Sequence, residues 1–331
     1  MSETKKKIKR TNTVQIVGTL VETGNLAFDE EATNQKNPKI VGAITRVDFK
    51  KPAFVIESNG QKIGVSPMMT YKSKVDKDGK IVDNPQFKAL EKVMEYEVGT
   101  RVMVKGSIAV GNPYMGKNGV VEPVSVQMFS MSSTSVPDED FAEGKVSGYV
   151  KNIKNETRGE DEEETGRLLV DFWMYDDYND AVLPFPLVVD EDIADDFENA
   201  FDNGDSVFFD FDIISRKVGG KSESKGFGSR KSKIVSGFSV TEYSIFNGEA
   251  VDDESEYYID EDVFKTLFKA HKQKVEEAKN SKSKSEDKPQ KGLGSARKSK
   301  VDVDEDDDEN PFDDWFSNLN KIYMGLSNQP H

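Results

Sequence analysis

Two stretches of the chain alternate hydrophobic and polar residues, which is the pattern of a β-strand with one buried face. Their inward positions are Val102, Val104, Gly106 and Ile108 in the first stretch, and Val207, Phe209, Phe211 and Ile213 in the second. Each stretch follows a segment with hydrophobic residues at helical spacing, which are Phe87, Leu90, Val93 and Met94, and then Ile193, Phe197, Ala200 and Phe201. The pattern predicts a helix and then a strand at two places, about 105 residues apart.

Two further stretches match at a similar distance along the chain. Residues 39–47 are similar to residues 145–153, and residues 124–129 are similar to residues 238–243. Matched stretches in the same order predict a duplicated domain. Three strands, a helix and two strands is the order of an oligonucleotide-binding (OB) barrel, and a glycine inside the first strand suits a strand that bends. The alternatives are two unrelated small β-barrels and a single large sandwich.

We therefore predict a mostly β fold with short helices: two tandem OB barrels, a disordered linker and a C-terminal amphipathic helix. The pairs Asn59-Gly60 and Asp78-Gly79 predict tight hairpins, and Asp260 is expected to cap a helix that packs on the second barrel. Residues 14–22 are either an extra edge strand or the true first strand. The expected divisions are a basic arm (1–13), the first barrel with an inserted hairpin at 68–84 (14–131), the second barrel (138–250), an acidic loop and helix (251–278), a basic flexible linker (279–300), and an acidic tip with a partner-binding helix (301–331).

Composition excludes several classes of site. The chain has no cysteine and two histidines, so it offers no thiolate zinc site, no disulfide framework and no histidine-based metal cluster. Residues 111–118 are similar to a phosphate-binding loop, but Asn118 stands where that motif has Ser or Thr. The following residues are also expected to form a strand and not a helix. We therefore expect a protein that is not an enzyme and needs no cofactor or metal. No apolar run is long enough to span a bilayer, and we expect a cytoplasmic protein in a bacterial or phage-infected cell.

The net charge of −16 hides an uneven distribution. Residues 1–130 carry a net charge of +6, residues 131–250 carry −15, and residues 251–331 carry −7. Bases and aromatic residues are interleaved in the positive part, as on surfaces where cations follow phosphates and rings stack on bases. There we expect nucleic-acid contacts from Arg46, Phe49, Lys50, Lys51, Phe54, Tyr71, Lys72, Lys74, Arg101, Lys105, Tyr114 and Lys117.

The second barrel is mostly acidic, but its last hairpin is basic. That hairpin could also contact nucleic acid. One face of the strand at 167–175 could do so as well, and the alternative is that its rings are buried against the first barrel. The residues are Arg167, Trp173, Tyr175, Arg216, Lys217, Lys221, Lys225, Phe227, Arg230, Lys231 and Lys233.

The last thirty residues combine acids with large hydrophobic residues. Residues 302–314 hold nine acids and no base, after a segment rich in lysine and serine. Asn310 and Pro311 suit the start of a helix, after which hydrophobic residues recur at steps of three and four. A helix after a loose linker is expected to bind a partner's groove, unless it folds back on its own barrels. The expected partner-binding residues are Asp306, Asp307, Asp308, Pro311, Phe312, Trp315, Phe316, Leu319, Ile322 and Tyr323.

In residues 306–312, a run of acids leads into Asn-Pro-Phe, and the chain here resembles single-stranded DNA-binding proteins of the bacterial or phage type. Those proteins have OB barrels, a linker and an acidic tip with Pro-Phe. The resemblance implies that Phe312 and the neighbouring acids recruit replication and repair proteins, and that the acids occupy the DNA groove when DNA is absent. The chain differs in having two barrels and nineteen residues after Phe312.

The expected function is therefore sequence-independent binding of single-stranded DNA in replication, recombination and repair. The expected partners are single-stranded DNA, and a polymerase, helicase or primase bound through the tail, with no membrane. Two alternatives stay open. One is a protein-interaction adaptor that mimics DNA with its acidic second barrel, and the other is an RNA-binding chaperone, because stacking surfaces accept either sugar.

Overall fold

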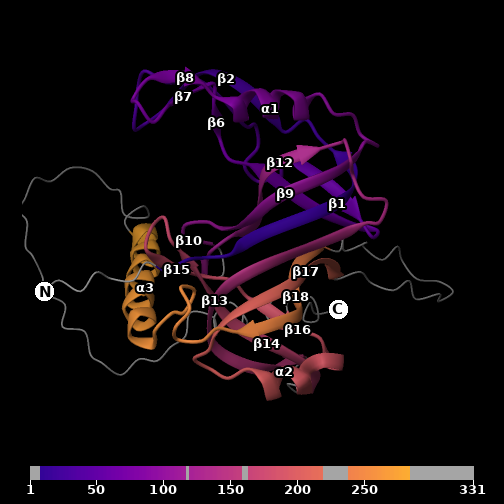
Figure 1. Cartoon of the computed structure of the whole chain (residues 1–331), viewed down its shortest axis with the longest axis vertical. Coiled ribbons are helices and arrows are strands. Elements are labelled where there is room, and N and C mark those ends of the chain that lie inside the picture. The colour runs from indigo at the N-terminus through magenta and orange to yellow at the C-terminus, as the bar shows by residue number, and fades with distance from the viewer. Residues whose placement is uncertain (1–7, 117–118, 159–162, 219–237, 284–331) are drawn as a thin grey trace, which may run out of the picture.

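The computed structural model describes residues 8–116, 119–158, 163–218 and 238–283, and strands dominate it (Figure 1). The first five-stranded barrel, barrel 1, contains β1 (Asn12–Glu22), β4 (Phe54–Ser58), β5 (Gln61–Pro67), β9 (Arg101–Val110) and β12 (Val124–Ser132). They form the ring β1–β4–β5–β12–β9, which β9 closes by pairing with β1. β5 and β12 run parallel, and the other neighbours run antiparallel. Helix α1 (Pro85–Met94) follows the third strand and buries Phe87, Leu90 and Val93.

Barrel 2 repeats this arrangement with β13 (Phe141–Arg158), β14 (Glu163–Asp176), β16 (Leu187–Val189), β17 (Ser206–Val218) and β18 (Phe238–Ala250). The ring order is β13–β14–β16–β18–β17, and β17 pairs back to β13. Its parallel pair is β16 and β18. The short strand β15 (Ala181–Pro184) pairs with β14, and the 3₁₀ turn η1 (Glu191–Ile193) leads into α2 (Ala194–Ala200).

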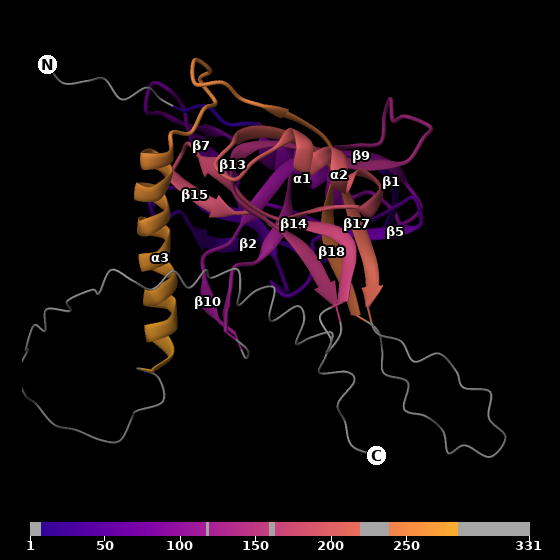
Figure 2. The same ribbon diagram turned by 90° about the horizontal axis from the view of Figure 1, so that it is seen from below.

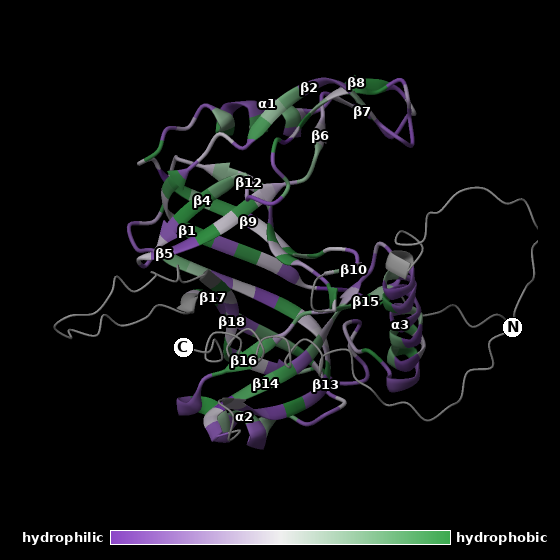
Figure 3. Ribbon diagram, turned by 180° about the vertical axis from the view of Figure 1, so that it is seen from behind, coloured by the Kyte–Doolittle hydropathy of each residue, from purple (hydrophilic) through white to green (hydrophobic). Residues whose placement is uncertain are grey.

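Both rings have the strand order, the parallel third and fifth strands and the intervening helix of an OB barrel. The sequence-based prediction of two tandem OB barrels is thus confirmed. Hydrophobic and polar positions alternate along β1, β9 and β13, as the change of colour along these ribbons shows (Figure 3). The inward residues of both barrels belong to one hydrophobic cluster, which includes Ile16, Val104, Phe172 and Phe209.

Barrel 1 has further strands between those of its ring. Between β1 and β4 lie β2 (Leu26–Thr33) and β3 (Val41–Arg46), and between β5 and α1 lie β6 (Thr70–Tyr71), β7 (Ser73–Val75) and β8 (Ile81–Asp83). The short pair β10 (Tyr114–Met115) and β11 (Val120–Val121) projects between β9 and β12. β4 and β5 meet at the predicted Asn59-Gly60 turn, and β7 and β8 form the predicted hairpin around Asp78-Gly79.

The expected first strand of barrel 1 was wrong. Residues 39–47, which were matched to residues 145–153, include β3, which lies outside the barrel in a small sheet. The true first strand is β1, the alternative left open for residues 14–22. Its Gly18 approaches the Glu57 carbonyl of the second strand, just as Gly148 in β13 approaches the Trp173 carbonyl. The insertion between β1 and β4 lengthens only barrel 1, so equivalent residues of the two barrels are not separated by one constant number of positions. A constant spacing therefore points to β3 instead of β1.

The two barrels join through an antiparallel pairing of their first strands. Val14 lies opposite Gly144, Asn12 opposite Val146, and Ile16 opposite Ala142. Val14 and Gly144 are equivalent, because they pair with equivalent positions of the fourth strands, Gly106 and Phe211. The pairing is therefore centred on a local two-fold axis, as in an isologous dimer contained within one chain.

Helix α3 (Glu261–Ser283) stands beside β15 and β10, as Figures 1 and 2 show from two directions. Asp260 caps it, since its Oδ1 accepts a hydrogen bond from the Asp262 amide at 2.9 Å. The predicted cap and the predicted packing on barrel 2 are confirmed. Of the helices in the described ranges, none is both long and apolar enough to cross a membrane.

Candidate nucleic-acid interface

A small three-stranded sheet lies outside barrel 1: β2 and β3 come from the insertion between its first and second strands, and β6 comes from the segment after its third strand. β3 is the central strand of this sheet and pairs with β2 and β6. Figure 1 shows the sheet at one end of the molecule, next to α1, β7 and β8. In OB barrels, oligonucleotides bind on the second and third strands and on the loops that join strands one to two and four to five. The insertion therefore replaces one of the loops that commonly contact nucleic acid.

The last residue of β3 is an arginine, and it lies beside an exposed phenylalanine of the following segment. The Arg46 guanidinium lies 5.2 Å from the centre of the Phe49 ring, and Arg46 Nη1 donates to the Phe49 carbonyl at 3.4 Å. The amide of Asn25 donates to the Lys51 carbonyl at 3.0 Å and to the Asp48 carbonyl at 2.9 Å, which fixes the loop. Phe49 is 66 % exposed, so the loop presents one open ring face with cations beside it.

Asn84 fixes the second part of the sheet. Its side-chain amide donates to the Tyr71 carbonyl at 2.9 Å, and its backbone amide donates to the Lys72 carbonyl at 2.9 Å. The same side chain caps α1 by accepting from the Gln86 amide. One residue thus ties the start of α1 to the end of β6 and to Lys72, which follows it.

Tyr71 and Lys74 line an open hollow with a volume of about 350 Å³. Lys36 and the amide side chains of Asn34 and Asn37 line it as well. The Tyr71 hydroxyl donates to the Thr33 carbonyl at 3.2 Å, which holds the ring against β2. The hollow thus combines cations and amide residues, which suit a phosphate, with Tyr71 and the apolar residues Ile40, Met68 and Met69, which suit a base.

The cations of this sheet are largely free to meet a polyanion. Within the described ranges, no carboxylate forms an ion pair with Lys50, Lys51, Lys72 or Lys74. Acids also lie near these cations, including Asp48 and the β2 residues Asp29, Glu30 and Glu31. Asp83 has its pKa lowered by a hydrogen bond from Lys88, and also by the charges of Lys88 and Lys72. We call the following residues the insertion surface: Arg46, Phe49, Lys50, Lys51, Tyr71, Lys72 and Lys74.

The other loop of barrel 1 that commonly contacts nucleic acid carries Tyr114. Tyr114 lies in β10 and is 52 % exposed. Lys105 is exposed on the outward face of β9, whereas Lys117 lies outside the described residues. Expected residues thus occur on both loops that flank the oligonucleotide surface of an OB barrel.

Comparison with known proteins places the chain in a family. The YorF family model matches residues 9–281, which include both barrels and most of α3. The chain belongs to the YorF family. A search of curated protein sequences gave no match.

Among solved structures, this YorF-family chain is similar to the single-stranded DNA-binding protein of Thermus aquaticus. A deletion mutant of that protein aligns with a TM-score of 0.41 and 9 % identity, covering 74 % of this chain and 96 % of the other. The wild-type protein aligns with a TM-score of 0.40 and 9 % identity, covering 74 % and 94 %. The OB assignment follows from strand order and register.

Two expected residues of barrel 1 have other roles in this YorF-family chain. Phe54 is 1 % exposed and lies in the core. Arg101 holds the segment between the barrels: its Nη1 donates to Asp140 Oδ1 at 2.7 Å, and its Nε donates to the Pro137 carbonyl at 2.9 Å. We therefore leave both residues out of the candidate interface.

Arg167 of barrel 2 is likewise enclosed. Its Nε donates to Asp190 at 3.0 Å, its Nη2 donates to Glu242 at 3.0 Å, and Glu156 lies within 3.5 Å. Burial lowers the pKa of Arg167, but these carboxylates outweigh burial and the net shift is upward. Three carboxylates already occupy this guanidinium, so it is not open to phosphate.

Trp173 is covered by α3, and Tyr175 is buried in the same cluster, which also includes Val182 and Ile259, with Ile8 packed against it. Trp173 has no exposed surface and Tyr175 is 7 % exposed. The sequence allowed for burial against barrel 1, but the cover comes from α3.

Several expected residues lie outside the described residues. The backbone of Arg216 and Lys217 belongs to β17, opposite Val240 and Ser239. The remaining expected residues of that hairpin are outside, and they are Lys221, Lys225, Phe227, Arg230, Lys231 and Lys233. The predicted linker, the acidic tip and the helix of the tail, with all expected partner-binding residues, are outside as well.

Lys36 is a site residue that sequence reasoning missed. Its Nζ donates to the Tyr178 hydroxyl at 3.2 Å, which joins the small sheet to the turn between β14 and β15 of barrel 2. Tyr178 is 77 % exposed. The polar residues around Lys36 gave no signal, because its role depends on a contact 142 positions away.

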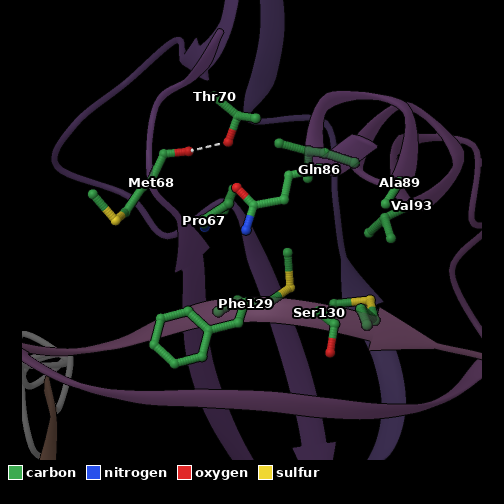
Figure 4. A pocket seen from close by; sticks show the side chains of 11 residues that line it. Pro67, Met68, Thr70, Gln86, Ala89, Val93, Phe129 and Ser130 are labelled. Carbon is green, nitrogen blue, oxygen red and sulfur yellow. Dashed lines mark hydrogen bonds between the residues drawn. The ribbon is translucent and has the colours of Figure 1, made fainter. Parts of the chain in front are cut away.

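A second hollow lies between α1 and β12 (Figure 4). Met68 and Phe129 stand at its edge and are 60 % and 61 % exposed. None of the eleven residues that line it is a lysine or arginine. We therefore do not include it in a surface for phosphates. In the described part of the chain, no cluster of three or more histidines or acids is placed to hold a metal ion.

Proposed function

We propose that this YorF-family protein binds single-stranded DNA without sequence preference, in DNA replication, recombination or repair. The observation that supports the proposal most is the insertion surface. It places cations, the exposed ring of Phe49 and the half-buried ring of Tyr71 on two insertions of an OB barrel, one between its first two strands and one after its third strand. This is the combination that sequence-tolerant binding of single strands requires.

Binding would depend on two kinds of contact. Lys50, Lys51, Lys72 and Lys74 would neutralise phosphates and release counterions, which makes affinity sensitive to salt. Phe49 and Tyr71 would stack on bases, and every base has a ring face, so the sequence of the strand has little effect. No covalent step is involved, and we propose that the protein is not an enzyme.

The C-terminal tail would give the protein its second role. The acidic residues and the hydrophobic residues from Phe312 to Tyr323 are proposed to recruit a polymerase, helicase or primase. The acids also repel DNA and compete with it for the insertion surface. The protein would therefore coat a strand and bring other proteins to it.

The test is a fluorescence anisotropy titration of the full chain against labelled oligo-dT, the matching duplex and the matching RNA, at two salt concentrations. We expect oligo-dT to bind more tightly than duplex. For four phosphate contacts, log affinity should fall with log salt at a slope of about −3. Equal binding to single strand and duplex, or none to either, would overturn the proposal, and preference for RNA would reassign the ligand.

A further inference from the structure

Three aromatic residues form a flat patch on the outside of barrel 2. They are Tyr149 in β13, and Trp173 and Tyr175 in β14, the first and second strands of the barrel. They belong to a cluster separate from the common core of the two barrels. The barrel interior is filled without them.

The equivalent positions in barrel 1 hold no aromatic residue. Thr19 and Tyr149 each follow one of the equivalent glycines, Gly18 and Gly148. In barrel 1 Thr19 pairs with Glu57, and in barrel 2 Tyr149 pairs with Trp173, so these two pairs correspond. Two residues further on, Tyr175 corresponds to Asn59 in the turn. Barrel 1 therefore forms the same fold with polar residues at these positions, so the fold does not require aromatic residues there. The aromatic patch is specific to barrel 2, on a strand that commonly contacts oligonucleotides.

The patch offers flat rings, and its polar atoms have partners on barrel 2. Trp173 Nε1 donates to Asp171 at 2.7 Å, and the Tyr175 hydroxyl donates to Asp180 at 2.8 Å. Lys151 stands at the edge, with its Nζ 3.2 Å from Asp171. Since these bonds come from barrel 2, they can persist when the rings are uncovered. Rings with a cation beside them form a surface on which bases stack.

Helix α3 occupies this patch with rings of its own. Phe264 is stacked on Tyr149 with ring centres 4.0 Å apart and planes 15° apart. Phe268 meets Trp173 edge-on at 4.8 Å, and Lys151 lies 4.9 Å from the Phe268 ring. The stack of Phe264 on Tyr149 has the geometry that a base would adopt there. A helix and a strand of DNA therefore cannot occupy the patch together.

The same face of α3, on which the His271 ring meets Trp173 edge-on at 5.0 Å, also contacts barrel 1. His271 Nε2 lies 3.1 Å from Glu122, in the segment that follows β11. That segment ends the loop that carries Tyr114. The helix thus connects the covered patch of barrel 2 with a loop that flanks the oligonucleotide surface of barrel 1.

We propose that Tyr149, Trp173 and Tyr175, with Lys151, form a second binding site for single-stranded DNA, and that α3 is a displaceable cover that closes it. The inference rests on the proposed function and adds a means of regulation. With α3 in place, single-stranded DNA contacts only the insertion surface. When α3 leaves, the same strand also stacks on barrel 2. Apparent affinity then depends on the fraction of molecules with the helix displaced.

The first experiment releases the helix in the full chain. The double substitution Phe264→Ala/Phe268→Ala removes the rings that cover the patch, and the exposed Val263→Ala on the same helix is the matched control. We expect release to tighten binding of oligo-dT about tenfold, a typical size for coupling between sites. Adding Trp173→Leu should remove the gain. Val263→Ala should change nothing.

A cross-link provides the opposite test. The chain has no cysteine, so His271→Cys and Glu122→Cys can be joined selectively by a short bismaleimide. Closing this link should hold α3 in place and weaken binding relative to the same variant before reaction. Trp173 and Trp315 are the two tryptophans, so in a Trp315→Phe background the intrinsic fluorescence reports Trp173 alone. A base stacked on the ring should quench this fluorescence, so oligo-dT should lower it before cross-linking and leave it unchanged afterwards.

The outcomes separate the cover from the proposed function. If the parent binds oligo-dT but neither release nor cross-linking changes its affinity, α3 is a permanent support and the cover is overturned. If no form binds oligo-dT, the proposed function fails and the cover fails with it. If only the released variant binds, the cover is supported. Should Phe264→Ala/Phe268→Ala not fold, the cross-linked pair decides.

Discussion

Gly18 and Gly148 hold equivalent positions in the two barrels, and each lies against a carbonyl of the neighbouring second strand. A Cβ atom would overlap the Glu57 carbonyl at Gly18 and the Trp173 carbonyl at Gly148. Neither glycine is needed for a positive φ, since neither is in the left-handed region. The close approach of two strands, where the first strand leaves one neighbour for the next, requires a residue without a side chain.

Alanine at either position should therefore destabilise the fold. Gly18→Ala and Gly148→Ala should each lower the free energy of unfolding by about 1–3 kcal/mol, the usual cost of overpacking. Gly79→Ala is the control, because Gly79 has a φ of +78° but open space around it, and its cost should be about 1 kcal/mol. Urea denaturation measures all three. A smaller loss at Gly18 than at Gly79 would contradict the steric role.

Charge reversal on the insertion surface should weaken binding of all single strands alike. For Lys72→Glu/Lys74→Glu we expect a lower affinity for oligo-dT and a salt slope smaller by about 1.4, or about 0.7 for each lost phosphate contact. Lys269→Glu, on an exposed position of α3, makes the same kind of change away from this surface. Anisotropy titrations at several salt concentrations measure the slope. Equal slopes for both variants would show that these lysines do not contact phosphate.

Stacking on Tyr71 gives a separate prediction. Tyr71→Ala should cost about 1–3 kcal/mol of binding, the usual value for one stacked base. Tyr71→Phe keeps the ring and loses only the hydrogen bond to the Thr33 carbonyl, so most affinity should remain. Titration with oligo-dT compares the two variants. The stacking role is wrong if alanine and phenylalanine reduce affinity equally.

Removing residues 301–331 should separate the two proposed roles. The deletion removes nine acids that compete with DNA, so affinity for oligo-dT should rise, most clearly at low salt. The same deletion should abolish capture of a purified polymerase, helicase or primase. A deletion restricted to residues 284–300, after the end of α3, keeps the acids and the hydrophobic residues and serves as the control. No change in either assay would discredit the tail.

Tyr175 should make stability depend on alkaline pH. Burial first, and then the hydrogen bond to Asp180, raise the pKa of Tyr175 to about 12 from an ordinary value near 10. Between these values the unfolded chain binds fewer protons than the folded chain, so stability falls as pH rises. Tyr175→Phe should show a shallower fall across this range in urea denaturation. Identical pH profiles would contradict the shift.

Much of the fold could be predicted from the sequence, because strict alternation and helical spacing reflect burial directly. The inward residues Val104 and Phe209 were read correctly from alternation alone. The first strand was misplaced because spacing is not constant: Gly18 and Gly148 are 130 residues apart, whereas Val102 and Val207 are 105 apart. An insertion changes spacing without changing the pattern of the strand.

The candidate site was less predictable, because exposure depends on contacts between distant segments. Arg101 points outward as alternation predicts, but the segment at Asp140 binds it. Trp173 also points away from the barrel core, but α3 covers it. No local pattern distinguishes such residues from Phe49 or Tyr71. Position in the three-dimensional structure, and not residue type, decides which cations and rings stay open.

Photochemical cross-linking tests the central claim most directly. The full chain is irradiated with an oligonucleotide that carries 5-iododeoxyuridine at successive positions, and cross-linked peptides are identified by mass spectrometry. Halogenated bases react with aromatic rings on which they stack, so we predict adducts at Phe49 and Tyr71, lost in Lys72→Glu/Lys74→Glu. Adducts confined to other parts of the chain, with none at either residue, would contradict the account.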